Sequence, residues 1–386
     1  MCLKKMVETF HADKDAQILL LSYTNRAVDE ICKSLASIAP AVDFIRVGSE
    51  LSCDEAYRGH LIENELSSCN RRSEVYERIR NCRIIVGTVA AISGKPELFR
   101  LKHFDVAIID EATQILEPQL LGILCARGED GKDAIDKFVL IGDHKQLPAV
   151  VQQNTEQSAI YDESLLSIGL TNLKDSLFER LYRNCTATVH RSYDMLCRQG
   201  RMHPEVALFA NRAFYGGRLI PVGLPHQIES SDTICRLAFY PSVPEKAGAS
   251  AKINYSEARI VADLAVRIYE DHQADFDESR TLGIITPYRS QIALIKKEIE
   301  SLGIPALNRI LVDTVERFQG SERDVIIYSF CVNYPYQLKF LSNLTEEEGV
   351  LIDRKLNVAL TRARKQMFIT GVSETTRTQS TLLKVY

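Results

Sequence analysis

Short apolar runs that end in polar residues recur along the first part of the chain. They cover residues 18–21, 84–86, 106–109 and 138–141. Uninterrupted apolar runs of this length are typical of strands buried on both faces. Segments with apolar residues at helical spacing, such as 3–13 and 25–39, lie beside them. Strands that alternate with helices predict an α/β fold with a parallel, doubly wound sheet, and right-handed crossovers place the polar residues after all four strands along one edge.

The run at 106–109 leads directly into two adjacent carboxylates, Asp110 and Glu111. A buried strand could not carry two acids internally, so they are expected to follow its end. Ligands of open parallel sheets bind outside the carboxyl ends of the strands, and carboxylate oxygens are suitable ligands for Mg²⁺. These two acids therefore predict a site for Mg²⁺ and a polyphosphate. The alternative is a strand that ends at a solvated acidic turn.

Thr24 and Asn25 lie where the first strand leads into the helix expected at 25–39. The free N–H groups of a helix N-terminus can bind a backbone phosphate, and an ordinary Asn cap is the alternative. Residues 50–80 are charged, polar and expected to be helical, and we predict that they form an insertion.

Polar residues dominate 152–164, and we place a domain boundary there. Further elements are expected in the second half of the chain. The expected helices are 173–182, 195–214 and 356–364, and the expected strands are 281–288, 310–315, 325–330 and 367–370. This pattern predicts two domains, 1–155, with an inserted helical segment at about 50–80, and 156–386.

Composition limits the classes of function. The 386 residues are 45% hydrophobic, and no apolar run approaches the roughly 20 residues needed to cross a bilayer. Ten cysteines without a C-x-x-C pair predict reduced thiols, and with no export signal we expect a cytoplasmic protein without membrane association. Because the net charge is −4, any contact with nucleic acid must come from a local basic groove.

Five motifs extend the prediction. They are GDHKQLP at 142–148, GRMHP at 200–204, ITPYRSQ at 285–291, ERFQGSE at 316–322 and LNVALTRAR at 356–364. In this order they resemble the superfamily 1 helicases, specifically the up-frameshift type, and the resemblance covers nearly the whole chain. It implies two tandem RecA-like domains of the P-loop NTPase type, with ATP and Mg²⁺ between them. It also implies single-stranded nucleic acid as partner, with DNA favoured over RNA, 5′ to 3′ movement and a monomer.

The resemblance also implies roles for individual residues. Asp110 resembles the acid that holds Mg²⁺, and Glu111 the base that orients the attacking water. Gln146 resembles the γ-phosphate sensor of the first domain, and Arg201 and Arg362 the arginines that reach this phosphate from the second, where a guanidinium suits spreading charge. For Arg362, an arginine on a helix surface is the alternative. The residues expected to bind the nucleotide are Glu322, at the ribose, Gly320 and Asp143.

The same resemblance predicts where nucleic acid binds. Short polar groups and main-chain N–H groups are expected to contact its backbone. The residues at these positions are Thr24, Asn25, Gly87, Thr88, Thr286 and Gln319.

Two features depart from the family's pattern. Gly200 stands where these helicases often carry an aromatic residue that can stack on adenine, which puts this stacking in doubt. No G-x-x-x-x-G-K-[ST] loop is present, because 94–96 and 131–133 have the wrong spacing and following residues. We expect a helicase whose first domain lacks its P-loop strand and which is inactive until that segment is supplied. The alternative is a hydrolysis-dead fragment that binds nucleic acid.

Overall fold

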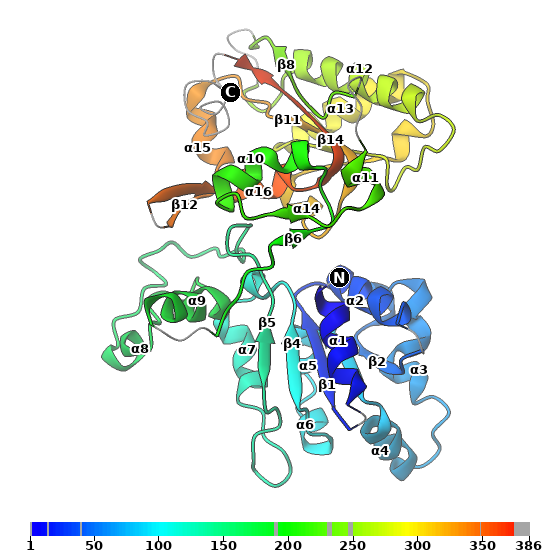
Figure 1. Ribbon diagram of the computed structural model, residues 1–386, viewed down its shortest axis with the longest axis vertical. Helices are drawn as coiled ribbons and strands as arrows, with labels where there is room; N and C mark the ends of the chain where they lie inside the picture. Colours follow the sequence, from blue (N-terminus) through cyan, green and yellow to red (C-terminus); the bar gives the residue numbers. More distant parts are fainter. Residues whose placement is uncertain are drawn as a thin grey trace. The chain divides into compact units, whose positions relative to one another are not determined.

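The computed structural model describes residues 2–13, 15–38, 41–188, 192–229, 234–245, 250–347 and 349–373. It divides into two compact units. Unit 1 comprises Met1–His144 with Pro148–Tyr193, and unit 2 comprises Lys145–Leu147 with Asp194–Tyr386. Each unit contains one five-stranded sheet with helices packed on it (Figure 1).

The sheet of unit 1 is parallel throughout, with strand order β2-β3-β1-β4-β5. Its strands are β1 (Ile18–Ser22), β2 (Phe44–Val47), β3 (Ile84–Thr88), β4 (Val106–Ile109) and β5 (Phe138–Leu140). β1, β3 and β4 are fully buried, as their apolar runs predict, and β2 is also fully buried, whereas β5, at one edge, is half-buried. β2 was not expected. Its run of four residues includes Arg46, which is completely buried and pairs with Asp29.

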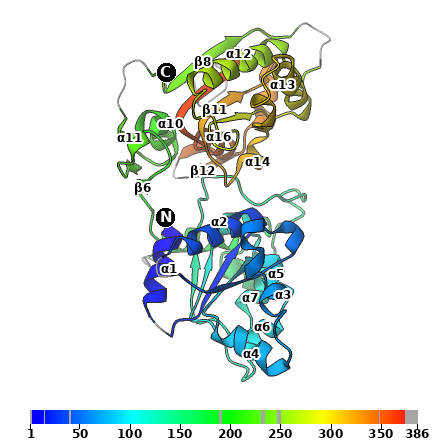
Figure 2. The same cartoon turned by 90° about the vertical axis from the view of Figure 1, so that its right-hand side faces the viewer.

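Helices cover both faces of the unit 1 sheet. One face packs on α1 (Cys2–Ala12) and α2 (Asn25–Ala36), and the other on α5 (Val89–Ser93) and α7 (Glu117–Leu124). Figure 2 shows α1 on one side of the strands and α5 and α7 on the other. The expected insertion at 50–80 is helical. It contains η1 (Glu50–Ser52), η2 (Glu55–His60), α3 (Ile62–Glu65) and α4 (Arg72–Asn81), with α6 (Glu97–Leu101) and η3 (Ala112–Gln114) following later in the unit.

Unit 1 extends further along the chain than the boundary expected at 155. Its later helices are α8 (Glu163–Ser167) and α9 (Leu177–Ala187). Arg180 of α9 makes two charge-assisted hydrogen bonds to Glu117 of α7, with Nη2–Oε1 at 2.5 Å and Nε–Oε2 at 2.8 Å. Leu177 joins the apolar core below η3 and α7. These contacts assign α9 to the first unit.

The sheet of unit 2 is also parallel, with strand order β10-β9-β11-β14-β8. Its strands are β8 (Leu237–Ser242), β9 (Leu282–Ile285), β10 (Leu311–Asp313), β11 (Arg323–Ser329) and β14 (Ala363–Val372). On one face lie α12 (Tyr255–Asp271) and α13 (Arg289–Ser301), and on the other α10 (Pro204–Phe214) and α16 (Arg354–Leu360). The remaining elements are β6 (Arg198–Gln199), β7 (Ile220–Pro221), α11 (Pro225–Ile228), η4 (Leu307–Arg309), α14 (Val315–Phe318), η5 (Pro335–Gln337), α15 (Leu338–Leu341), β12 (Leu344–Glu347) and β13 (Val350–Asp353).

The α/β fold class with two parallel sheets is confirmed, and two local predictions in unit 2 were wrong. Residues 195–214 do not form one helix, because Pro204 at the first helical position and His203 as N-cap start α10 only there. The helix expected at 356–364 ends at Leu360, and the chain enters β14 at Ala363. Arg362 therefore lies in a turn and is not on a helix surface.

Candidate nucleotide and nucleic-acid sites

In unit 1 the two predicted acids follow β4 where its neighbours also end. The Asp110 amide donates to Leu21 O at 2.8 Å, and the Ala112 amide donates to Ile141 O at 2.8 Å. Because parallel strands end on one side, these bonds bring the carboxyl ends of β1, β4 and β5 together. Asp110 and Glu111 therefore lie at the edge of the sheet that the sequence predicts.

Glu111 adopts a left-handed backbone conformation, with φ 53° and ψ 37°. This conformation is uncommon for a residue with a side chain and costs of order 1 kcal/mol or more. It turns the chain sharply from β4 into η3, and Gln114 Nε2 then donates to Glu111 Oε2 at 2.8 Å. The strained turn fixes the Glu111 carboxylate beside Asp110.

The acid pair has the electrostatics of a cation site. Burial, and then the neighbouring carboxylate of Glu111, raise the pKa of Asp110 to about 6. Among the residues placed by the structure, no lysine or arginine forms an ion pair with Asp110 or Glu111. Two close carboxylates without a basic partner fit a hard divalent cation such as Mg²⁺.

In unit 2 the predicted charged residues lie at the amino-terminal edge of the sheet, where the strands begin. Glu322 directly precedes β11, and Arg362 directly precedes β14. Arg201 Nε contacts Glu322 Oε2 at 2.7 Å, and Arg364 Nε lies 3.6 Å from Glu322 Oε1. Burial pushes the pKa of Glu322 upward, but the nearby guanidinium groups outweigh it and hold this pKa below its ordinary value. Arg201 and Glu322 thus form one charge cluster.

Arg362 is 2% exposed and is held by several acceptors. Its Nε donates to Val358 O at 3.0 Å, and its Nη2 donates to Gln146 Oε1 at 2.9 Å. Gln146 was expected in the first domain, but the stretch Lys145–Leu147 belongs to unit 2 by its contacts. Asn357 also holds this stretch, donating from Nδ2 to Lys145 O at 2.8 Å.

The other two predicted nucleotide-binding residues take separate positions. Gly320 is exposed, with φ +76°, a conformation that glycine adopts without strain. It follows α14 and precedes Glu322. Asp143 lies in unit 1, directly after Gly142, where an added Cβ would come within 2.9 Å of the Thr113 side chain. The two residues are thus in different units.

Two residues of these clusters were not predicted. Arg364 forms ion pairs with both Glu322 and Asp324, and its Nη1 lies 3.2 Å from Asp324 Oδ1. The sequence could have indicated this residue, because Arg364 lies two positions after Arg362 in the same motif, LNVALTRAR. His226 lies 2.8 Å from Arg201 O through Nε2. No motif contains His226, so nothing in the sequence marked it.

The predicted nucleic-acid residues of unit 1 lie after neighbouring strands. Thr24 and Thr88 are N-caps of α2 and α5, and their Oγ1 atoms accept from the Ala27 and Ala91 amides at 3.2 and 3.1 Å. An accepting hydroxyl keeps its own proton for donation to a phosphate. Asn25 is the first residue of α2. Gly87 is explained by packing, since an added Cβ would lie 2.9 Å from a backbone oxygen of β2.

In unit 2, Thr286 follows β9 and is fully buried. Its amide donates to Asp313 O at 3.1 Å, while its Oγ1 has no hydrogen-bond partner. Gln319 follows α14, and its Nε2 likewise lacks a partner. A buried polar atom without a partner costs stability, which is consistent with a ligand that satisfies it.

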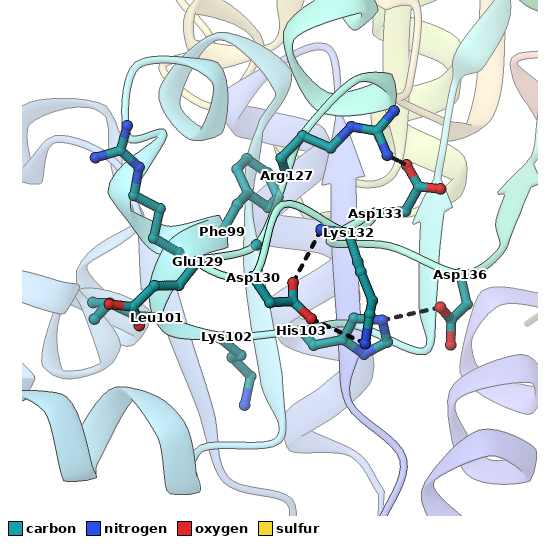
Figure 3. A pocket seen from close by; sticks show the side chains of 12 residues that line it. Phe99, Leu101, Lys102, His103, Arg127, Glu129, Asp130, Lys132, Asp133 and Asp136 are labelled. Atoms are coloured by element: carbon teal, nitrogen blue, oxygen red, sulfur yellow. Dashed lines mark hydrogen bonds and ion pairs between the residues drawn. The ribbon is translucent and has the colours of Figure 1, made fainter.

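A separate hollow lies at the amino-terminal edge of the unit 1 sheet, lined by residues that precede β4 and β5 (Figure 3). Six of its charged or titratable side chains form three pairs with one another. His103 Nε2 lies 2.9 Å from Asp136 Oδ1, and Lys132 Nζ lies 3.3 Å from Asp130 Oδ2. Since Asp110 and Glu111 occupy the opposite edge, this hollow is not part of the predicted site.

Comparison with known proteins identifies the relatives of this fold. Residues 63–154 and residues 173–374 each match an AAA domain family. The chain belongs to the AAA domain family. It is 30% identical to the DNA replication ATP-dependent helicase/nuclease DNA2 of Xenopus laevis, over 92% of this chain and 33% of that protein. It is 28% identical to the DNA replication ATP-dependent helicase/nuclease JHS1 of Arabidopsis thaliana, over 94% of this chain and 25% of that protein.

Among solved structures, an arterivirus nonstructural protein 10 (helicase) in complex with DNA matches all of this chain and 59% of its own, with 13% identity and a TM-score of 0.48. The expected helicase family is confirmed by the curated relatives. This AAA-family chain spans about a third of the length of the first of them. Within the part of the chain that the structure describes, no helix is long and apolar enough to cross a membrane.

Proposed function

We propose that this chain is the motor core of an ATP-dependent helicase that moves along single-stranded nucleic acid, with DNA favoured over RNA. The observation that carries the proposal is the Asp110–Glu111 pair at the carboxyl end of β4. One of these acids has a raised pKa, and the other is held by a strained turn. A carboxyl group with a raised pKa beside a residue held in a strained backbone conformation is characteristic of a reaction centre.

In this proposal Asp110 holds Mg²⁺ and Glu111 orients the attacking water. The cation would neutralise charge on the phosphates of ATP. Glu111 suits a base because its carboxylate is positioned by Gln114 and by its backbone. Asp143 lies after the neighbouring strand and serves the same nucleotide.

The charge cluster of unit 2 supplies positively charged side chains for the phosphates of ATP. Arg362 and Arg201 act on the γ-phosphate, where a guanidinium matches the charge of the transition state. Gln146, bonded to Arg362, senses the same phosphate. Glu322 and Gly320 contact the rest of the nucleotide, and the Arg201–Glu322 contact keeps the arginine in place.

Nucleic acid binds through the short polar groups that follow the strands. In unit 1 these are the cap hydroxyls of Thr24 and Thr88, with Asn25 and the main chain at Gly87. In unit 2 they are Thr286 and Gln319, whose buried polar atoms lack partners. Such contacts read the backbone and give little sequence preference.

The sequence contains no G-x-x-x-x-G-K-[ST] loop. Phosphoryl transfer depends mostly on positioning the phosphates, so we propose that turnover requires such a loop in addition to these residues. The 386-residue polypeptide alone then hydrolyses ATP slowly. The second candidate function, a hydrolysis-dead module that binds nucleic acid, is favoured by this same feature.

ATP hydrolysis by this chain supplied with a G-x-x-x-x-G-K-[ST] segment, with and without a single-stranded oligonucleotide, tests the proposal. We expect the strand to stimulate turnover, and Asp110→Asn to abolish the stimulation while strand binding persists. Asp133→Asn is the matched control, since this exposed acid lies on the other edge of the same sheet. Strand binding without any stimulated turnover would favour the hydrolysis-dead module.

A further inference from the structure

Two tyrosines stack on each other just after the end of β11. The ring centroids of Tyr334 and Tyr336 lie 5.8 Å apart, and the ring planes differ by 10°. Tyr336 is 54% exposed and Tyr334 is half-buried. Exposed aromatic side chains lose contact with water when a planar group stacks on them. The pair therefore presents a flat, apolar surface at the carboxyl edge of the unit 2 sheet.

The turn that carries these rings is fixed by Gln337, which is 3% exposed. Its Oε1 accepts from the amides of Asn333 and Tyr334 at 3.0 and 2.9 Å. Its Nε2 donates to Ala251 O at 2.6 Å and to Tyr288 Oη at 3.3 Å. Because one buried amide ties the turn to two other segments, the stacked rings occupy a defined position.

The Tyr288 segment places the rings near Thr286, one of the predicted nucleic-acid residues. Tyr288 belongs to the turn between β9 and α13, two residues after Thr286. β9 is the direct neighbour of β11 in the sheet. Since both strands are parallel, Thr286 and the tyrosine pair follow the same edge. Arg362 and Glu322 precede strands and lie at the other edge, so the tyrosines are separate from the charge cluster.

The surroundings of the pair carry positive charge. Lys252 follows Ala251, Arg289 follows Tyr288, and Lys339 lies in α15, and all three are exposed. Within the ranges that the structure describes, none of the three forms an ion pair. The acid nearest in the hydrogen-bond network is Glu245, which accepts from the Tyr255 amide at 2.6 Å. Exposed cations around aromatic rings suit a strand with phosphates outside and bases inside.

We propose that Tyr334 and Tyr336 form a stacking platform for bases of single-stranded nucleic acid. The inference rests on the proposed function, because it adds base contacts to a strand whose backbone lies at Thr286. Stacking on aromatic rings tolerates any base, since every base has a π-face. The platform therefore adds affinity without adding sequence preference.

Binding of a fluorescein-labelled oligothymidylate of about 20 nucleotides to the 386-residue chain tests the platform. We expect the double substitution Tyr334→Ala with Tyr336→Ala to weaken binding roughly 10- to 100-fold, and the corresponding Phe substitutions to weaken it little. Tyr161→Ala is the matched control, because this tyrosine is 81% exposed in unit 1. Affinity for an abasic strand of equal length should be the same for the wild type and the double Ala variant.

A second measurement reports stacking directly. The chain contains no tryptophan, so Tyr336→Trp introduces a single indole. We expect the oligothymidylate to quench its fluorescence and the abasic strand to leave it unchanged. If the wild type binds no strand at all, the proposed function fails. If the wild type binds but the Ala variant binds equally well and the indole is not quenched, the platform alone is refuted.

Discussion

Arg362 Nη2 donates to Gln146 Oε1 at 2.9 Å, although 216 positions of sequence separate the two residues. The guanidinium is almost fully buried and also donates to Val358 O. A buried cation is stable only when acceptors surround it. The side chain of Gln146 therefore helps to hold Arg362 in position, and in the proposed function this guanidinium acts on a phosphate.

Replacing Arg362 by Lys tests whether the several N–H donors of the planar guanidinium are needed. A lysine keeps the charge but cannot donate to Val358 O and Gln146 Oε1 together. In the chain supplied with a G-x-x-x-x-G-K-[ST] segment, we expect ATP turnover to fall roughly 10³-fold, the scale of an arginine finger, while strand affinity stays within a few-fold. Circular dichroism melting of each variant checks that the fold survives. Wild-type turnover in Arg362→Lys would contradict a role for this residue in the transition state.

Glu111→Gln removes the proposed base and keeps the shape of the side chain. The amide cannot accept a proton from water, so turnover should drop by roughly 10²- to 10⁴-fold. Nucleotide affinity should remain, because Asp110 is unchanged. Equilibrium binding of a fluorescent ATP analogue separates the two effects. A parallel loss of affinity and turnover would assign Glu111 to binding instead.

Asp110 should make the stability of unit 1 depend on pH and on Mg²⁺. Its pKa is raised from 3.8 to about 6, so the folded chain keeps the proton longer than the unfolded chain. The free energy of unfolding then decreases as pH rises from about 4 to 6, by about 1–2 kcal/mol for a partly exposed group. Mg²⁺ binds the ionised form, and we expect it to restore this loss at pH 7.5 but not at pH 4.5.

Hydrogen exchange of the amides in β1 and β4 measures this effect. Asp110→Asn should remove both the pH dependence and the response to Mg²⁺. Equal stabilisation by Mg²⁺ in the wild type and in Asp110→Asn would place the cation elsewhere.

The sheets were predictable where the sequence has uninterrupted apolar runs. β1, β3, β4 and β9 are such runs, and their carboxyl-end residues Thr88, Asp110 and Thr286 follow from the same pattern. β2 was not predicted because it contains Arg46, whose charge is compensated by Asp29 of α2. The local pattern of apolar and polar residues does not show that Asp29 will lie beside Arg46 in the fold.

The charge cluster of unit 2 was predictable only through the motifs. Arg201 and Glu322 are 121 positions apart, and no local rule joins them. The position of Gln146 shows the same limit, because its bond to Arg362 and the bond of Lys145 O to Asn357 join residues more than 200 positions apart in sequence. The tyrosine pair carries no motif, and its proximity to Tyr288 depends on the buried amide of Gln337.

Glu257 gives unit 2 a pH dependence of its own. It is fully buried, and its Oε2 accepts from Ser329 Oγ at 2.6 Å and from the Cys331 amide at 2.9 Å. Burial raises its pKa from 4.5 to about 7. The folded state therefore favours the protonated acid, and the free energy of unfolding decreases as pH rises from 4.5 to 7.

Glu257→Gln imitates the protonated acid, because its amide oxygen can accept both bonds and its NH₂ can donate to Ser242 Oγ. We expect unit 2 of this variant to unfold at the same denaturant concentration at pH 5 and pH 8, and to be at least as stable as unit 2 of the wild type at pH 8. Glu257→Ala should lose about 1–3 kcal/mol at both values, because the donors are left buried without an acceptor. If the stability of unit 2 fell with rising pH as steeply in Glu257→Gln as in the wild type, Glu257 would not be the source of this pH dependence.

The ion pair between Arg180 and Glu117 predicts that α9 unfolds with unit 1. Both side chains are 11% exposed, so removing one leaves the other charge nearly buried and unpaired. We expect Arg180→Ala to cost roughly 3 kcal/mol and to raise hydrogen exchange in α7 and α9 together, while β9 and β11 of unit 2 keep their protection. Arg183→Ala on the same helix is the control, since its pair with Asp175 is more exposed and should cost less than about 1 kcal/mol. If Arg180→Ala left the exchange of α7 unchanged, α9 would not be a structural part of the first unit, and the boundary near position 155 would describe the domains better.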